Sequence, residues 1–379
     1  MKRITALLCL ILLMMAAPLT AYAAEENSTD ALYEQQMQRS GADRLYSGLP
    51  EEAKQLLLQN GITAPEPDML RSVDFRRITE CMVQLLTEKS RSPCSALFLS
   101  LGTILLCSMV SGTTISMGES SMQKTISAVG ALCICTAVIL PLCRLVERCG
   151  EIIEGAAGFM TLYVPVMTGL MVSASHPVQG AGYYSTVMTA SELIGWLSSG
   201  MILPVIRILL GLSVTSSLSQ GFHLSGVCTA ISRSLKWIMN FALGIFVTIL
   251  SAQNLITSSM DEVSIKAARM AMNSFIPVVG GVLSETVSTF SGSLSLLKSG
   301  TGVFVIIASA CIFLPVLIEC FLWRCSFLLI SAAADMLGLG TVKASTDAAE
   351  CVTGLLTAVL LTIMMLFIIS TVVILMVGQ

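Results

Sequence analysis

The nonapeptide Phe275-Ile276-Pro277-Val278-Val279-Gly280-Gly281-Val282-Leu283 has an earlier copy, Tyr163-Val164-Pro165-Val166-Met167-Thr168-Gly169-Leu170-Met171. The two copies match as aromatic, β-branched, Pro, Val, apolar, small, Gly, apolar, apolar. A second apolar proline motif follows each copy, Ile202-Leu203-Pro204-Val205-Ile206 after the earlier one and Phe313-Leu314-Pro315-Val316-Leu317 after the later one. The Pro-to-Pro separations are 39 and 38 residues, and such a shared offset predicts an internal repeat. The alternative is coincidence between apolar helices built from a small alphabet.

The predicted repeat units cover residues 155–257 and 267–377, and each contains three apolar segments. An odd number of membrane crossings turns the second unit over relative to the first, which predicts an inverted repeat of the kind found in transporters. If the first, proline-led segment of each unit is re-entrant, the two units are parallel instead. The third segments of the two units align poorly.

Composition places the chain in a membrane. The 379 residues are 54% hydrophobic and 12% charged, and the mean hydropathy is +0.83, well outside the usage of soluble domains. Charge is also segregated, because residues 24–93 are rich in charged side chains and residues 94–379 are poor in them. We therefore predict an all-α, polytopic membrane helix bundle over 94–379, preceded by a small helical extracytoplasmic region over 24–93.

The N-terminus has the pattern of a secretory signal peptide over residues 1–23. Met1-Lys2-Arg3 is basic, an apolar run follows, and Ala21-Tyr22-Ala23 is a small-x-small cleavage site. A signal peptide sends residues 24–93 outside the cytoplasm; the alternative is a retained anchor helix.

Residues 24–93 contain the signals of two helices. Leu49-Pro50-Glu51-Glu52 predicts the start of the first helix, and Asn60-Gly61 predicts its end. A second helix is expected over 73–89, and we expect the region to pack on the membrane domain or on a partner.

The apolar runs predict seven or eight membrane spans. Positive charges divide equally between the two sides, so the orientation depends on the signal peptide alone. The run 275–297 carries Glu285 and many Ser and Thr residues, so it is either buried in the bundle or re-entrant. At most, the spans are residues 95–114, 126–143, 155–174, 187–213, 235–257, 275–297, 301–322 and 353–377.

Ionisable residues inside predicted spans are candidate functional residues, because a charge in hydrocarbon is costly. They are Glu192, Arg207, Glu285 and Glu319. Arg207 follows Pro204 by three positions and Glu319 follows Pro315 by four, so the repeat predicts an ion pair between Arg207 and Glu319. Alternatively, these charges form structural ion pairs or reach toward the membrane interface.

The repeated prolines are also candidate functional residues, because they interrupt helices. Pro165, Pro277, Pro204 and Pro315 each remove a backbone donor from a helix, and Gly280 and Gly281 follow Pro277 directly. Transporters build binding sites from such broken helices. The alternative is that they are packing kinks, since Pro and Gly are frequent in membrane helices.

Several kinds of chemistry have no support in the sequence. The chain lacks a phosphate-binding G-x-x-x-x-G-K-[ST] loop, an H-E-x-x-H zinc motif and a G-x-S-x-G nucleophile elbow, so we expect neither an enzyme nor a cofactor. A net charge of −3 without a basic cluster makes nucleic acid an unsuitable partner. Most of the thirteen cysteines lie in apolar runs, where Cys behaves as a small hydrophobe.

The later half of the chain resembles the stage III sporulation protein AE family. The resemblance rests on Ala267-Ala268-Arg269, the run from Phe275 to Glu285, Leu296-Leu297-Lys298 and Gly300-x-Gly302. The layout of signal peptide, helical external region and polytopic domain is also similar. The family has no established catalytic residues to carry over.

This resemblance implies a multi-pass protein of the mother-cell membrane around the forespore. Its partners would be the other membrane subunits of the same sporulation operon, including a secretion-type ATPase and ring-forming proteins, and through them a forespore membrane protein. The expected role is a permease-like or conduit subunit that supports late forespore gene expression and spore maturation. The alternatives are an autonomous ion-coupled transporter using Glu192, Glu285 or Glu319, and an assembly platform that transports nothing.

Overall fold

A computed structural model describes residues 30–64, 75–116, 120–218, 225–275 and 280–376. Every described element is a helix, which confirms the all-α prediction. The predicted signal peptide (residues 1–23) and Pro277 lie outside the described residues. The helices are α2 (Asp30–Ser40), η2 (Ala42–Arg44), α3 (Glu51–Gln59), α5 (Phe75–Ser116), α6 (Ser120–Ser173), α7 (Pro177–Leu197), the π-helix η3 (Ser198–Ile202), α8 (Leu203–Leu218), α9 (Ser225–Phe275), α10 (Gly280–Met336) and α11 (Gly340–Met376).

The short N-terminal helices form where the local sequence favours them. Helix α3 begins after Pro50, has two acidic residues in its first turn and ends at Asn60, as predicted. Gly61 follows with φ +75°, a left-handed conformation that glycine adopts without strain. We call α2, η2 and α3 together the N-terminal layer.

Six long helical segments carry candidate membrane spans among the described residues. They run over Glu80–Val110, Thr136–Ser173, Pro177–Leu212, Thr229–Asp261, Leu294–Met336 and Val342–Leu375. The six apolar helices indicate a multi-pass membrane protein, and the described residues carry six candidate spans where seven or eight were predicted for the whole chain. The difference arises because α6 joins the predicted spans 126–143 and 155–174, and α10 joins 275–297 and 301–322.

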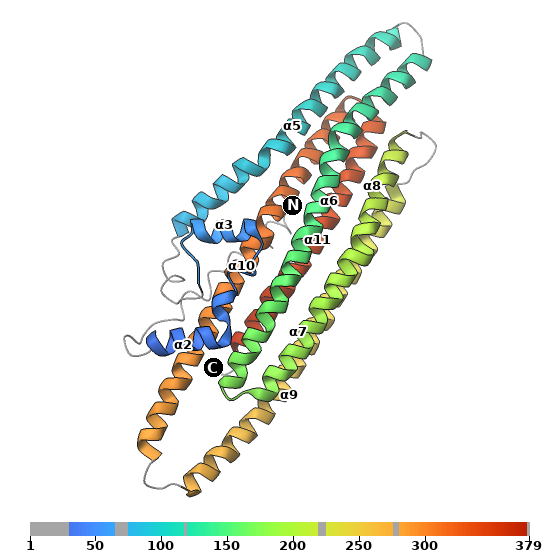
Figure 1. Ribbon diagram of the computed structural model, residues 1–379. Coiled ribbons are helices and arrows are strands. Elements are labelled where there is room, and N and C mark those ends of the chain that lie inside the picture. The colour runs from blue at the N-terminus through green and yellow to red at the C-terminus, as the bar shows by residue number, and fades with distance from the viewer. Residues whose placement is uncertain (1–29, 65–74, 117–119, 219–224, 276–279, 377–379) are drawn as a thin grey trace.

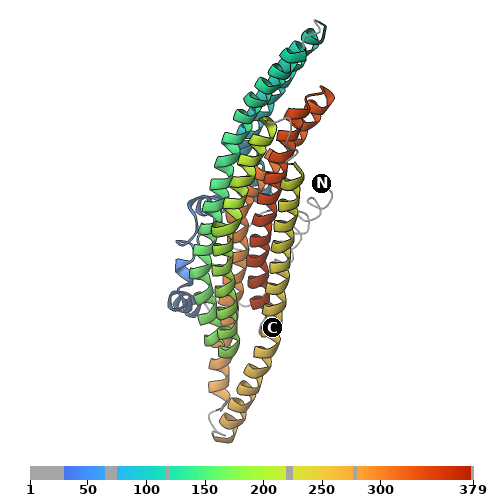
Figure 2. The same ribbon diagram turned by 90° about the vertical axis from the view of Figure 1, so that its right-hand side faces the viewer.

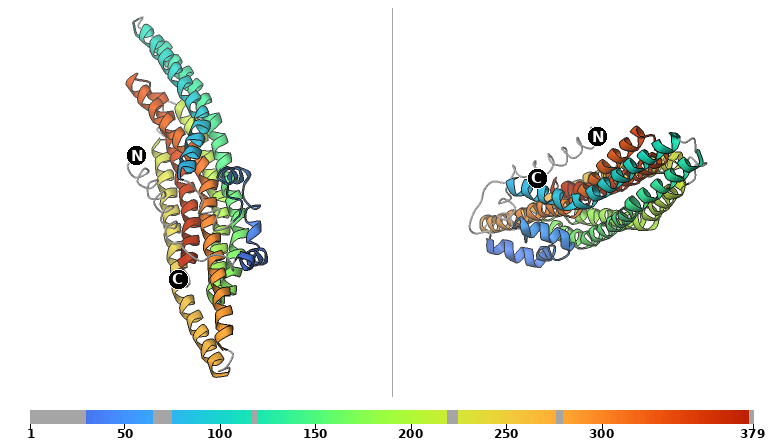
Figure 3. Two further views of the ribbon diagram at one scale, coloured as in Figure 1. Left: turned by 90° about the vertical axis from the view of Figure 1, so that its left-hand side faces the viewer. Right: turned by 90° about the horizontal axis from the view of Figure 1, so that it is seen from above.

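The long helices pack side by side as an elongated bundle (Figures 1 and 2). Helices α5 and α6 extend together at one end, and α9 and α10 extend together at the other. Helix α11 packs against α10 and α9, while α7 and α8 pack against α6, α9 and α11. The N-terminal layer lies against the side of the bundle, on α6 and α10, and Figure 3 shows it projecting from that side.

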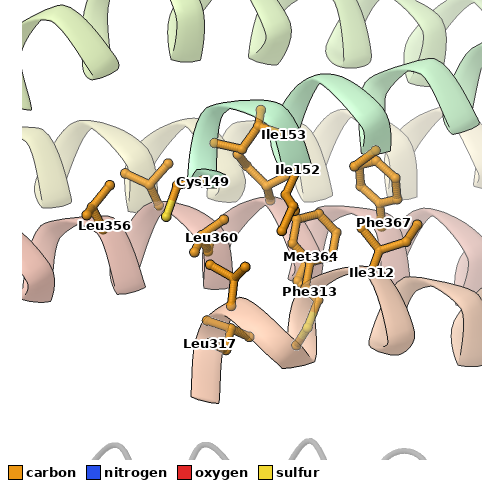
Figure 4. Packing of buried hydrophobic residues seen from close by; sticks show 14 of the residues in the cluster. Cys149, Ile152, Ile153, Ile312, Phe313, Leu317, Leu356, Leu360, Met364 and Phe367 are labelled. Carbon is orange, nitrogen blue, oxygen red and sulfur yellow. The ribbon is translucent and has the colours of Figure 1, made fainter. Parts of the chain in front are cut away.

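A continuous apolar core fills the centre of the bundle. Ile152 of α6, Phe313 of α10 and Phe367 of α11 meet there, and the two phenylalanine rings pack edge to face with centroids 5.7 Å apart (Figure 4). Seven large aromatic side chains in the core are at most 2% exposed: Phe159, Tyr163, Phe304, Phe313, Trp323, Phe327 and Phe367. The interior of the single chain is therefore packed side chain against side chain.

The three repeated prolines that the structure describes occupy dissimilar places. Pro165 lies inside α6 and Pro315 inside α10, whereas Pro204 is the second residue of α8 and follows the π-helix η3. The first two segments of the earlier unit are separated by the turn between α6 and α7, but the corresponding segments of the later unit share the single helix α10. The predicted three-segment arrangement is thus not common to both units, and the internal repeat stays unconfirmed.

Candidate functional site

Charged side chains from several helices gather at one level of the bundle. Arg148 of α6 donates to Glu319 of α10 at 2.9 Å and to Glu52 of α3, and Lys89 of α5 lies 3.4 Å from Glu52. Five positions further along α10, Arg324 donates to Glu350 of α11 at 2.9 Å. We call this set the charge belt: Glu52, Lys89, Arg148, Lys236, Glu319, Arg324 and Glu350.

An uncharged zone follows the belt on three helices, and we call it the apolar slab. It comprises residues 237–260 of α9, 299–318 of α10 and 351–376 of α11, none of which is charged. At about 1.5 Å per residue these segments span roughly 30–40 Å, close to the ~30 Å hydrocarbon thickness of a bilayer. Asp261 of α9 and Lys298 of α10 bound the slab at its far end.

The belt attaches the N-terminal layer to the bundle. The Glu52 side chain is half exposed, and its carboxylate accepts hydrogen bonds from Arg148 and Lys89. Partial burial acts to raise the pKa of Glu52, but hydrogen bonds and charges from Arg148 and Lys89 outweigh it, so the pKa lies below its ordinary value of 4.5. A small apolar cluster of Leu56, Leu85 and Ile318 supports the same attachment.

The N-terminal layer reaches from the belt deep along the slab. A Cβ atom on Gly155 would lie 3.1 Å from Pro50, one on Gly48 would lie 2.5 Å from the Leu162 side chain, and one on Gly41 would lie 3.8 Å from Val166. Contacts therefore follow α6 from residue 148 to 166, which is about 27 Å along the helix axis. The outward side of the layer is polar, with exposed Arg39, Asp43, Arg44, Glu51 and Gln55.

The structure does not bring the predicted Arg207–Glu319 pair together. Glu319 bonds to Arg148, and the Arg207 side chain is exposed on α8, so that prediction was wrong. Glu192 is exposed on α7. Helix α7 begins beside Asp261 at the far end of the slab, and Leu203, which follows α7 and η3, lies against Gly150 near the belt. Glu192 lies between these two points in the chain and is therefore at slab depth.

The remaining candidates divide between surface and core. The Pro165 and Pro204 rings are exposed, whereas Pro315 is buried. Gly280 and Gly281 begin α10, and Glu285 follows in the same helix. The side-chain surroundings of Glu285 lie outside the described residues.

Sequence reasoning missed a polar cluster between α7 and α9. The buried carboxylate of Asp261 accepts from the backbone N–H groups of Val178 (3.2 Å) and Gln179 (2.9 Å), which caps the N-terminus of α7. Gln179 also donates to Asn254 at 2.5 Å, and Thr186 donates to Gln253. The signal available in the sequence was the pair Gln253-Asn254 inside an otherwise apolar run.

A small cavity lies next to this cluster. Its volume is about 10 Å³, close to the lower limit for one water molecule. Gln179, Tyr183, Gln253, Asn254 and Thr257 are among its lining residues. The Gln179 side-chain oxygen is buried without a hydrogen-bond partner among the described residues, and the Tyr183 hydroxyl is buried beside Tyr163 and Ser370.

Neither a metal centre nor a disulfide forms within the described part of the chain. No group of three or more His, Cys, Asp or Glu side chains converges there. Cys81, Cys94, Cys143 and Cys149 are all free thiols. Cys149 is buried in the core beside Cys320.

Comparison with known proteins identifies relatives of the chain. The stage III sporulation protein AE of Bacillus subtilis (strain 168) is 21% identical over 216 residues, which are 56% of this chain. The chain thus spans about half (54%) of that curated relative. No solved structure was found to match. The model of the family described as stage III sporulation protein AE matches residues 69–378, a range that includes all six candidate spans, and the chain therefore belongs to this family.

Proposed function

We propose that this protein is a multi-spanning subunit of a sporulation transport complex, and that its polar N-terminal layer faces an aqueous passage formed between subunits. The family supports a role in sporulation, and the six apolar helices support a place in the membrane. The mother-cell membrane around the forespore is the proposed location. The role as a conduit subunit is our inference from the arrangement of charge and burial.

The observation that carries the proposal is the depth of the N-terminal layer. The layer contacts α6 over about 27 Å, most of the length of the apolar slab, and its outward side carries exposed charged side chains. Polar groups that lack partners cost several kcal/mol in hydrocarbon, so lipid is an unsuitable neighbour for this face. Water or another protein must therefore cover this face, and at slab depth water can remain there only if neighbouring subunits keep lipid away.

Glu192 supports the same conclusion from another side of the bundle. Its carboxylate is exposed on α7 at slab depth. A lone carboxylate facing lipid at that depth is unfavourable, and such residues usually face a polar cavity or a partner. A neighbouring subunit that meets α7 there would remove this cost.

The packed interior favours a passage between subunits over one through a single chain. Large aromatic side chains occupy the centre of the described bundle, and the cavity beside Tyr183 has a volume of only about 10 Å³. Other membrane subunits of the same operon, ring-forming proteins and a forespore membrane protein would complete the passage. Energy would come from a separate secretion-type ATPase, because this chain has no phosphate-binding loop.

Cysteine labelling in membranes from sporulating cells tests the proposal. Arg44→Cys and Gln55→Cys place thiols on the exposed side of the layer, and the matched controls Phe241→Cys and Ile249→Cys place them on the exposed side of α9 in the slab. In membrane fragments open on both sides, a charged maleimide should label the layer positions and spare the α9 positions. The unsubstituted chain gives the background from native cysteines.

Two results would contradict the aqueous passage. Layer positions that resist the charged reagent as strongly as Phe241→Cys would place this face in lipid. Layer positions that are protected in the complete complex, but labelled when the neighbouring operon genes are deleted, would indicate an assembly platform covered by protein. Solute uptake by the purified chain alone in vesicles would instead favour an autonomous transporter.

A further inference from the structure

Two cationic groups from different helices converge on one glycine at the level of the charge belt. The Lys236 ammonium of α9 and the Arg324 guanidinium carbon of α10 would each lie 3.6 Å from a Cβ atom on Gly354 of α11. Helix α11 lies between the other two, and the missing side chain leaves room for both groups over its surface. A Cβ at this distance makes ordinary contact, so alanine would fit, whereas a larger side chain would occupy part of this space.

The positive charge at this place is only partly neutralised. Glu350 accepts from one terminal nitrogen of Arg324 at 2.9 Å, but the buried Arg324 Nε has no hydrogen-bond partner among the described residues. No described carboxylate lies within 4.0 Å of the Lys236 ammonium. Arg233 is exposed one turn earlier on α9 and adds a further positive charge. A group with one or two negative charges and several acceptor oxygens would complete the site.

An apolar stripe leads from this site along the slab. Trp237, Phe241, Ile245 and Ile249 follow one another at four-residue spacing on α9, and each side chain is at least 45% exposed. The Trp237 and Phe241 rings stack with centroids 5.3 Å apart. The stripe extends about 18 Å along the helix, and residues at this spacing form a continuous row on one side.

We propose that Lys236, Arg324 and Gly354 bind the phosphate of an anionic phospholipid, whose acyl chain lies along the Trp237–Ile249 stripe. A basic cluster between membrane helices at the bilayer surface suits a lipid headgroup. An exposed Trp beside it suits the interface between headgroups and hydrocarbon. Free phosphate would use the cations but not the stripe, which is why we assign the site to a lipid.

Thermal unfolding of the purified full chain in detergent tests the site, with added lipid as the probe. Phosphatidylglycerol should raise the Tm more than phosphatidylcholine at the same concentration. Lys236→Gln should raise the phosphatidylglycerol concentration needed for a given rise in Tm roughly fivefold, the loss of affinity expected for one cation at a lipid surface. This variant keeps the Arg324–Glu350 ion pair, so its fold should be retained.

Arg207→Gln is the matched control, because Arg207 is an exposed cation on α8 and is not among the nearest groups to Gly354. It should keep the full phosphatidylglycerol effect. Trp237→Ala should reduce that effect without any change in charge. An equal loss in Arg207→Gln, an unchanged response in Lys236→Gln, or inorganic phosphate acting as strongly as phosphatidylglycerol would each overturn the proposal.

Discussion

Arg148 is the residue on which the attachment of three helices depends, because it bonds to both Glu319 and Glu52. Arg148→Gln would leave Glu319, whose side chain is 15% exposed, without its cation. We expect a loss of about 1–3 kcal/mol in the free energy of unfolding, the cost of an unsatisfied buried polar group. Adding Glu319→Gln should recover part of the loss, since the buried charge is then removed. Thermal unfolding of the single and double variants measures both effects.

A surface ion pair provides the comparison for this prediction. Lys54 and Glu51 lie 2.8 Å apart, but Glu51 is 80% exposed. Lys54→Gln should therefore change stability by less than about 1 kcal/mol. If Arg148→Gln behaves like Lys54→Gln, or if its effect simply adds to that of Glu319→Gln, the two belt residues are not coupled.

Glu319 could be recognised from the sequence as an unusual charge within an apolar run. Its partner, Arg148, could not be predicted. Arg148 is 171 positions away in sequence, in the charged stretch between the predicted spans 126–143 and 155–174. The relative register of two long helices decides which side chains meet, and this register depends on packing across the whole bundle. Residue patterns within one helix carry no information on it.

At the scale of elements, the docking of α3 should depend on pH. The pKa of Glu52 is lowered in the folded chain because Arg148 and Lys89 favour its charged form. Its contribution to stability is therefore present above the ordinary pKa of 4.5 and is lost as the pH falls through the lower, folded value. The Tm difference between the unsubstituted chain and Glu52→Gln should be constant near neutral pH and disappear in acid. A difference that grows in acid would contradict this assignment of charge.

The helix boundaries of α3 were predictable because its signals are local: Pro50 precedes the first turn, and Asn60-Gly61 closes the last. The predicted second helix was wrong at its end, since α5 continues past Lys89 and through the buried Pro93 to Ser116. The predicted boundary between 93 and 94 thus falls within one helix. Helix α6 likewise continues through Arg148, because ion pairs with other elements satisfy charges that would otherwise favour a loop.

For the whole molecule, composition was sufficient to predict a helical membrane protein, but not its position in the bilayer. Hydropathy alone indicates eight apolar runs, whereas helices of the folded chain extend beyond the slab at both ends of the bundle (Figure 1). The slab becomes apparent only when the belt residues of different helices are aligned by their contacts. Depth is therefore a property of the assembled bundle.

The three tryptophans allow this depth to be measured. Trp237 lies at the belt and is 65% exposed, Trp196 is 67% exposed on α7 within the slab, and Trp323 is 1% exposed in the core. In single-tryptophan variants, reconstituted in vesicles with brominated lipids, bromine near the headgroup should quench Trp237 most strongly. Bromine deeper in the acyl chain should quench Trp196 more than Trp237, because a bromine atom quenches only fluorophores at its own depth. Trp323 should respond weakly to both lipids, since protein surrounds its ring. If Trp237 is quenched most by the deepest bromine, the belt lies within the hydrocarbon and the slab does not match the bilayer.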